Sequence, residues 1–238
     1  LLALAAVAAA APAADPAGWA DLLAPGAAGP WKKVDPAWVR AADAGLDPDR
    51  PGRLKPVTPG DGPVWVNGDK GRVADLITKE AYGDCEAHVE FLLGKNSNSG
   101  IKFHAVYEIQ FRDTAGQPDD KLSGDSCGGV YPRAEYKNGY RHIDKGIAPK
   151  VNAAKPAGEW QTLDVTFRAP RFDAAGKKTE NARVVKAVLN GRVIHEDLEL
   201  TTPTGTNWVK AETPTGPFML QADHGPVAFR NVRVRPIR

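Results

Sequence analysis

Hydrophobic and polar residues alternate with a period of two along much of the chain, in runs bounded by Gly, Pro, Asn and Asp. This alternation is typical of strands that bury one face. Asn190-Gly191 lies between two such runs and predicts a hairpin, because a type I′ turn needs positive φ at both central residues. The pattern predicts strands at residues 85–93, 100–104, 107–112, 160–168, 183–189, 191–196, 218–222 and 227–235.

Short strands with no helical periodicity between them predict an all-β fold, a two-sheet sandwich or jelly roll with few short helices. The 24 glycines and 20 prolines favour turns and long ordered loops. Residues 16–63 contain Trp19, Trp31 and Trp38 and are expected to form a covering segment pinned by these rings. Residues 114–155 carry few strand signals, and a loop of that length is usually functional, so we expect it to form a wall of a binding cleft.

The first eleven residues are apolar and lead into Ala11-Pro12-Ala13, a small-x-small pattern of the kind that signal peptidase cleaves. We therefore interpret residues 1–13 as a partial signal peptide and residues 14–238 as a single domain; the alternative is a short Ala-rich helix of the domain itself. No other stretch approaches the length of a membrane span. The protein is expected to be exported, periplasmic or extracellular.

Export would permit a disulfide between Cys85 and Cys127, closing a loop of about 40 residues. Two unrelated buried thiols are the alternative. The 31 Lys and Arg residues are balanced by 29 Asp and Glu, which excludes a nucleic-acid binder driven by phosphate neutralisation. Strand alternation also places Arg230 on the opposite face from Arg233 and Arg235, so no single basic stripe is expected there.

The strand at 107–112 is the clearest candidate for a site. Alternation puts Glu108, Gln110 and Arg112 on one face, opposite a hydrophobic face. With Asp113, the order Glu-x-Gln-x-x-Asp resembles the carboxylate strand of sandwich-fold glucanases, except that Gln110 replaces the middle acid. A retaining mechanism needs two carboxyl groups about 5 Å apart, so this replacement weakens that mechanism. A solvated strand face is the alternative reading.

Several turns offer further polar groups. Asn98 lies in Ser-Asn-Ser-Gly just before a strand, beside a glycine whose backbone can approach a ligand. Tyr131 follows two glycines and could stack on a sugar or donate its hydroxyl. Lys155 and Glu159 flank a turn before a strand and are candidates for proton transfer or hydroxyl recognition. Taken singly, each of these features is also common on ordinary surfaces.

The loop Gln221-Ala222-Asp223-His224-Gly225 joins two strands and contains a histidine with a carboxylate immediately beside it. A neutral imidazole can act as an acid or a base near neutral pH. Gln221 offers an amide to a substrate hydroxyl. A structural histidine is the alternative.

Taken in order, these segments resemble the 3-keto-disaccharide hydrolase domain family over residues 31–238. The motifs are Ser-Asn-Ser-Gly, Tyr-Glu-Ile-Gln, Cys-Gly-Gly-Val-Tyr, Lys-Pro-Ala-Gly-Glu-Trp-Gln, Ala-Pro-Arg-Phe-Asp, Asn-Gly and Leu-Gln-x-Asp-His-Gly-Pro-Val-Ala-Phe-Arg-Asn. The resemblance implies a concanavalin A-like lectin/glucanase jelly roll, and cleavage of glycosides whose glucose is oxidised at C3. Ala222 departs from an expected Gly, and Ile101-Lys102-Phe103-His104 replaces a more apolar stretch, so the substrate is less well defined than the fold.

A ketone at C3 acidifies the proton at C2, so a base can remove it, the enolate can expel the C1 substituent, and water can add back. Such a site needs a base, an acid and an enolate stabiliser. A divalent metal could polarise the ketone, with Glu108, Asp113 and His224 as candidate ligands, and its use is left open. The base and acid candidates are Glu108, Asp113, Lys155, Glu159 and His224; the substrate-binding candidates are Asn98, Gln110, Tyr131, Gln221 and Arg230.

The leading hypothesis is therefore an exported enzyme that cleaves 3-keto-glucosides, by elimination and hydration or by direct hydrolysis. The alternative is a lectin-like module that binds carbohydrate without turnover, since fold does not fix function. A conventional glucanase is a third hypothesis, against which Gln110 argues. Carbohydrate is the expected partner, and the oligomeric state is left open.

Overall fold

The computed structural model describes residues 18–24 and 29–237. The predicted signal segment lies outside these residues, and export stays a prediction. Within the described part of the chain, no helix has the length and apolar character needed to cross a membrane.

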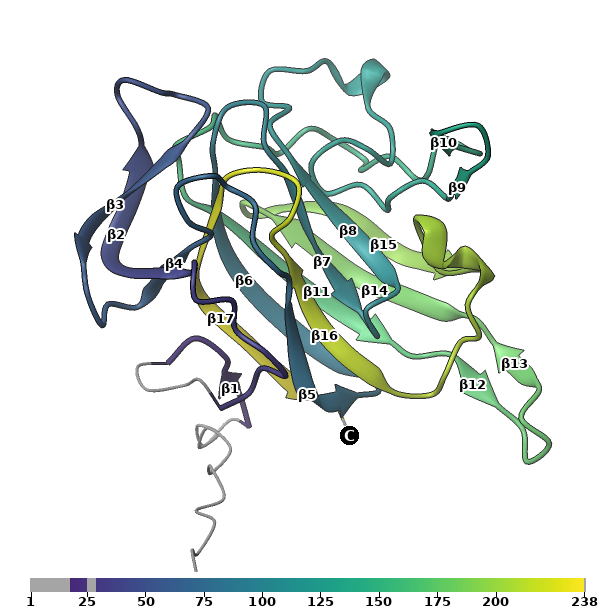
Figure 1. Cartoon of the computed structure of the whole chain (residues 1–238). Coiled ribbons are helices and arrows are strands. Elements are labelled where there is room, and N and C mark those ends of the chain that lie inside the picture. Colours follow the sequence, from purple (N-terminus) through teal and green to yellow (C-terminus); the bar gives the residue numbers. More distant parts are fainter. Residues whose placement is uncertain (1–17, 25–28, 238) are drawn as a thin grey trace, which may run out of the picture.

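The strands form two antiparallel sheets that pack face to face (Figure 1). The larger sheet has nine strands in the order β15-β14-β11-β6-β17-β4-β2-β3, with β1 paired to β17. The smaller has four, in the order β5-β16-β7-β8. The bounds in the larger sheet are β1 Ala20–Asp21, β2 Val39–Leu46, β3 Leu54–Pro59, β4 Val64–Val66, β6 Cys85–Leu93, β11 Gln161–Arg168, β14 Ala182–Leu189, β15 Arg192–Leu200 and β17 Val227–Pro236. In the smaller they are β5 Leu76–Tyr82, β7 Asn98–Phe103, β8 Tyr107–Arg112 and β16 Gly216–Gln221.

Two short hairpins and two 3-10 helices complete the described chain. The hairpins are β9–β10 (Ala134–Tyr136 and Tyr140–His142) and β12–β13 (Arg171–Phe172 and Lys178–Glu180). The helices are η1 (Asp119–Lys121) and η2 (Thr206–Val209). The predicted all-β sandwich with few short helices is confirmed.

The hydrophobic face of each sheet supplies the core between them. Phe91 of β6 stacks on Phe111 of β8, with ring centroids 3.7 Å apart, and Phe103 of β7 stacks on Phe167 of β11 at 4.5 Å. All four rings are buried. Side chains alternate along a strand. Because Phe103 and Phe111 point into the core, the residues next to them on β7 and β8 point to the outer face of the small sheet.

Several predicted boundaries agree with the structure. The strands at 85–93 and 107–112 coincide with β6 and β8. Asn190 and Gly191 join β14 to β15 and have φ values of 50° and 80°, as a type I′ turn requires. Cys85 and Cys127 are free and buried, so the reading as two separate thiols is the one the structure supports.

The prediction for residues 16–63 was incomplete. Trp31 and Trp38 are buried there as expected, but β2 and β3 also pair and extend the large sheet. β5 was not predicted at all. Its middle residues Lys79, Glu80 and Ala81 are exposed, so its sequence lacks the clean alternation of the other strands.

The prediction that Arg230 lies on the opposite face of its strand from Arg233 and Arg235 was wrong. A register shift lies between Arg230 and Arg233, where Asn231 adopts a φ of 47°. Arg230, Arg233 and Arg235 pair with Glu90, His88 and Glu86, alternate residues of β6 that share one face. The bulge therefore brings the three arginines to the same face. Glu90 and Glu86 form ion pairs with Arg230 and Arg235, so acidic residues accompany this row.

Burial of two histidines predicts a loss of stability in mild acid. His104 and His195 are 6% and 3% exposed, and burial lowers the pKa of both imidazoles. The unfolded chain takes up these protons near pH 6.5, where the folded chain resists them. Stability is therefore full above about pH 6.5 and falls as the pH drops below it. Urea unfolding at pH 7.5 and 5.5 should show this drop, and His195→Gln should reduce it; an equal drop in the variant would contradict this account.

Candidate functional site

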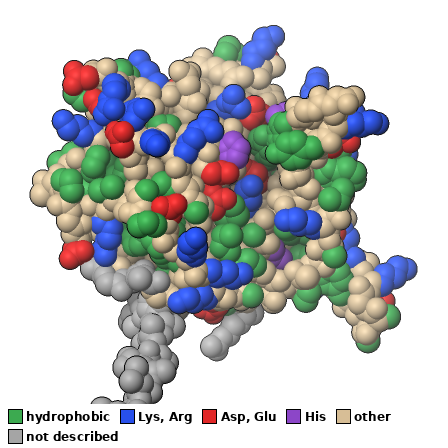
Figure 2. All heavy atoms as spheres, in the orientation of Figure 1, with side chains coloured by type: hydrophobic (Ala, Val, Ile, Leu, Met, Phe, Trp, Pro, Cys, Tyr) green, Lys and Arg blue, Asp and Glu red, His purple; other side chains and the backbone are tan. Residues whose placement is uncertain are grey.

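Polar side chains on the outer face of β16, β7 and β8 form a surface, called the floor below, that contains Lys102, Glu108, Gln110 and Gln221. Strand pairing places Lys102 between Met219 and Glu108. Beyond β8, Tyr131 donates its N–H to the Glu108 carbonyl oxygen at 3.2 Å, which extends this row by one residue. Figure 2 shows acidic, basic and histidine side chains gathered over these strands, with hydrophobic side chains beside them.

Glu108 and Lys102 form the central ion pair of this floor. Lys102 Nζ lies 3.0 Å from Glu108 Oε2, and the two side chains are only 12% and 3% exposed. A Cβ at position 100 would lie 3.1 Å from Glu108 Oε1 and 2.9 Å from the Ile109 carbonyl oxygen. Glycine at position 100 therefore lets the Glu108 carboxylate lie close over β7.

The charges of this pair depend on its surroundings. Burial raises the pKa of Glu108, and the nearby Lys102 and His224 offset this only in part. Burial would lower the pKa of Lys102, but attraction to Glu108, Asp75 and Asp223 outweighs it and the pKa lies above its ordinary value. Lys102 is therefore an ammonium ion at neutral pH, a fixed positive charge in a largely desolvated place.

Two buried amide oxygens on this floor have no hydrogen-bond partner among the residues that the structure describes. Gln110 donates from Nε2 to Asp125 Oδ1 at 2.8 Å, which leaves its Oε1 buried and unbonded. Gln221 Oε1 is likewise buried without a partner. Leaving a buried acceptor unpaired costs about 1–3 kcal/mol. Both oxygens are therefore unsatisfied acceptors within the floor and are closed to solvent in this conformation.

One side of the floor carries a histidine and two carboxylates. His224 Nδ1 makes a short hydrogen bond to Asp223, and this bond raises the pKa of His224. Asp75 accepts a hydrogen bond from the Ala222 N–H at 2.7 Å, which ties the chain before β5 to this loop. Burial raises the pKa of Asp75. The Asp223 bond occupies Nδ1, so Nε2 is the nitrogen of His224 that is left to act on a ligand.

The opposite side carries a cluster of aromatic hydrogen-bonding groups. The Tyr131 hydroxyl lies 3.0 Å from the Tyr140 hydroxyl and 2.9 Å from His142 Nε2. Burial raises the pKa of both tyrosines, so both hydroxyls stay protonated at neutral pH. Tyr131 comes from the loop after β8, and Tyr140 and His142 come from β10. Residues 114–155 therefore supply the hydroxyl and imidazole groups on this side of the floor, and their role as a wall of a binding cleft stays a prediction.

The structure brings together six of the ten predicted site residues. Glu108, Gln110 and Gln221 lie on the floor, and strand alternation puts Asn98 on the same face of β7 as Lys102. Tyr131 and His224 stand on its two sides.

Four predicted residues lie elsewhere. Asp113 accepts a hydrogen bond from the Asn96 N–H at 2.9 Å and so holds the turn before β7. Lys155 and Glu159 are exposed in the turn before β11, where Lys155 Nζ donates to the Trp160 carbonyl oxygen at 3.1 Å. Arg230 pairs with Glu90 at 2.6 Å and lies 4.1 Å over the Trp160 ring, on the outer face of the large sheet.

Several residues of the site were not in the predicted set. Lys102 had a signal, because it alternates with the hydrophobic Ile101 and Phe103 and so shares a face with Gly100. Asp223 was noted beside His224 but given no role of its own. Asp75, Asp125, Tyr140 and His142 reach the site from segments distant in sequence, and no local pattern marks them.

The candidate metal ligands are not assembled. Glu108, Asp113 and His224 do not form a cluster, and the described residues contain no group of three or more His, Cys, Asp or Glu side chains arranged to hold an ion. We therefore derive no step through a metal.

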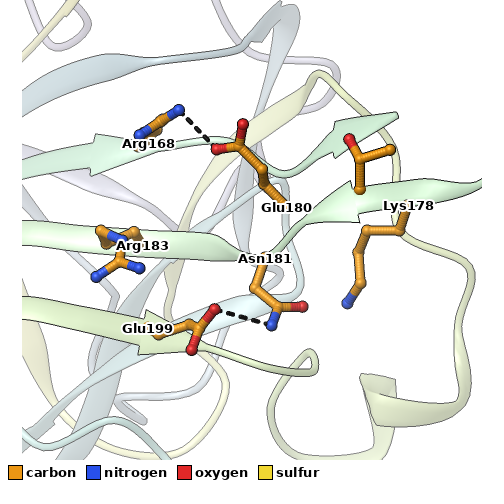
Figure 3. A pocket seen from close by; sticks show the side chains of 7 residues that line it. Arg168, Lys178, Glu180, Asn181, Arg183 and Glu199 are labelled. Atoms are coloured by element: carbon orange, nitrogen blue, oxygen red, sulfur yellow. Dashed lines mark hydrogen bonds and ion pairs between the residues drawn. The ribbon is translucent and has the colours of Figure 1, made fainter. Parts of the chain in front are cut away.

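A different pocket, of about 360 Å³, lies at the edge of the large sheet (Figure 3). Charged groups in it already have partners: Arg168 pairs with Glu180 at 2.6 Å, and Glu199 accepts a hydrogen bond from Asn181 at 3.1 Å. Among the described residues that line it, no buried polar atom lacks a partner. The floor around Glu108 lies outside this pocket and is therefore the stronger candidate for the functional site.

Comparisons with known proteins agree with this fold. Residues 19–235 match the family described as the 3-keto-alpha-glucoside-1,2-lyase-like domain. A crystal structure of a "putative glycosyl hydrolase" from Parabacteroides distasonis ATCC 8503 is 25% identical with a TM-score of 0.56, covering 75% of this chain and 73% of that one. A second from the same organism is 16% identical with a TM-score of 0.56, covering 93% and 95%. No curated protein matches the chain in sequence. The chain belongs to the family of 3-keto-α-glucoside-1,2-lyase-like domains.

Proposed function

We propose that this protein cleaves the glycosidic bond of 3-keto-glucosides by elimination across C1 and C2, followed by addition of water. The observation that carries the proposal is the buried Lys102 ammonium on the floor, between the His224 imidazole on one side and the Tyr131 hydroxyl cluster on the other. Membership of the lyase-like family, and likeness to a structure described as a glycosyl hydrolase, support a carbohydrate-active enzyme.

In the first step, His224 Nε2 takes the proton from C2, and the electron pair of the C–H bond moves to form the C2–C3 enolate. Asp223 holds the imidazole through Nδ1 and stabilises the imidazolium that forms. Lys102 places its positive charge beside the enolate oxygen at C3. Glu108 acts through Lys102, by holding the ammonium in place.

In the second step, the enolate electrons return, C1 and C2 become doubly bonded, and the bond from C1 to the leaving oxygen breaks. That oxygen takes a proton from the Tyr131 hydroxyl, which is hydrogen-bonded to His142 and Tyr140. Water then adds its oxygen to C1 and its proton to Tyr131, while His224 returns its proton to C2. The sum is hydrolysis of the glycoside to 3-keto-glucose and an alcohol.

Release of p-nitrophenol from a 3-keto-glucoside, compared with its unoxidised parent, tests this function. We expect release from the keto compound alone, because only the C3 ketone acidifies C2. A substrate carrying deuterium at C2 should react more slowly, and in heavy water the recovered 3-keto-glucose should carry deuterium at C2.

Release without an isotope effect or exchange would favour direct hydrolysis. Release from the parent alone would indicate a conventional glucosidase. If neither compound released p-nitrophenol as either anomer, the proposal would be overturned in favour of a carbohydrate-binding module.

A further inference from the structure

The β9–β10 hairpin follows the long loop after β8 (Figure 1), and each of its strands carries a tyrosine. Tyr136 and Tyr140 are paired across the hairpin, their side chains 78% and 47% exposed and their ring centroids 5.4 Å apart. Val209 of η2, which packs beside β9, is 70% exposed. Isolated exposed rings need no explanation, but a group of exposed apolar side chains at the rim of a polar site is typical of a binding surface.

The hairpin is fixed at its base. Trp208 Nε1 donates to the Ala134 carbonyl oxygen at 2.9 Å, and Arg133 Nε pairs with Asp144 Oδ2 at 2.6 Å. The Arg133 guanidinium lies 5.8 Å over the Trp208 ring. The backbone that carries the two rings is therefore held in position before a ligand arrives, which lowers the entropic cost of binding.

The rings continue the site outward. Tyr131 neighbours Glu108 in strand register, the Tyr131 hydroxyl meets the Tyr140 hydroxyl at 3.0 Å, and the Tyr140 ring meets the Tyr136 ring. A sugar that reacts over Lys102 and Glu108, with its leaving oxygen at Tyr131, would direct the group attached to C1 toward Tyr140 and Tyr136. Arg141 of the hairpin is paired with Glu135, so ring faces are the recognition surface offered there.

We propose that the Tyr136 ring, with the Tyr140 ring inclined to it at 66°, forms a platform for the leaving group of the substrate, and that this group carries a ring with an apolar face, that of a sugar or of an aromatic compound. This inference rests on the proposed function. Tyrosine suits the role because its ring offers a large apolar face at a low entropic cost. Tyr136 binds the leaving group and takes no part in bond breaking.

Kinetics of Tyr136→Ala with three 3-keto-glucosides, carrying methyl, p-nitrophenyl and glucosyl groups at C1, test the platform. We expect kcat/KM to fall about twofold to tenfold for the two ring-bearing compounds, the range typical of one aromatic contact. The methyl compound should be unaffected, since it has no ring to stack. Tyr136→Phe should keep wild-type values, and Val57→Ala, which trims a side chain 50% exposed on β3, is the control for loss of surface apolar area.

The pattern of losses identifies the leaving group. A fall for the nitrophenyl compound alone indicates an aromatic group, and a fall for the glucosyl compound alone indicates a sugar; either result supports the platform. An equal fall for all three, or no fall, overturns it. If the wild type turns over none of them, the proposed function fails, and calorimetric binding of the same three compounds to wild type and Tyr136→Ala decides the platform by the same pattern.

Discussion

His224→Gln is expected to lower kcat for a 3-keto-glucoside by about 10²–10⁴-fold, the usual contribution of a positioned general base. The amide of glutamine can keep a hydrogen bond to Asp223 but cannot take a proton from C2. Substrate binding should be largely retained, because the floor residues are untouched. Steady-state kinetics with the p-nitrophenyl 3-keto-glucoside measures the change.

His88→Gln is the matched control, because His88 Nδ1 also lies against a carboxylate, Asp164 at 2.7 Å, but on β6 of the large sheet. It should keep wild-type kcat. The hydrogen bond that Asp223 accepts from His224 Nδ1 raises the pKa of His224, so activity should rise with pH as the imidazole loses its proton above its ordinary value of about 6.5. Asp223→Asn should move this rise to lower pH. A His224→Gln variant with wild-type kcat would show that another group removes the C2 proton.

Lys102→Met should destabilise the fold by about 3–5 kcal/mol at neutral pH, because it leaves the Glu108 carboxylate buried without its cation. Without Lys102, the pKa of Glu108 in the folded state stays above its value in the unfolded chain. The folded state then holds its proton more tightly, and stability falls as the pH rises above about 4.3. Urea unfolding of the variant at pH 5 and pH 8 should therefore show the larger loss at pH 8.

Lys155→Met is the control for removing a lysine, since Lys155 is exposed and outside the site; it should change stability little. Adding Glu108→Gln to Lys102→Met removes the unpaired charge and should recover much of the lost stability at pH 8, but not turnover. If the single variant were as stable as wild type at pH 8, Glu108 would not depend on Lys102 for its charge.

The strands of the core were predictable because each buries one face, and alternation records this directly in the sequence. β6 shows it in its burial, with a buried side chain at every second position from Cys85 to Phe91, whereas β8 alternates in residue type but is buried on both faces. The same rule placed Glu108 and Gln110 together and would have placed Lys102 with them. Alternation did not predict the faces of the arginines on β17. The positive φ of Asn231 shifts the register there, and hydrophobic periodicity does not reveal such a bulge.

The rest of the site depends on contacts between distant segments. Asp75 is positioned by the hydrogen bond that it accepts from the Ala222 N–H, and Tyr140 by the β9–β10 hairpin, which brings its hydroxyl to Tyr131. Lys155 and Glu159 appeared equivalent to Glu108 in sequence, as charged residues beside strands. Their turn leads into β11 of the large sheet, so they lie away from the floor of the small one. Which sheet a strand joins is a long-range property, and it decides which charges meet.

The place of β17 also bears on the order in which the molecule assembles. This strand follows all others in sequence, yet it lies between β6 and β4 and pairs with β1 as well. The two halves of the large sheet stay unconnected until residues 227–236 insert between them, and pairing across such sequence separations makes folding slow. Until then β6 and β4 each present an open strand edge, the kind of surface through which chains associate with one another. We therefore expect delayed insertion of β17 to be the step at which folding competes with aggregation.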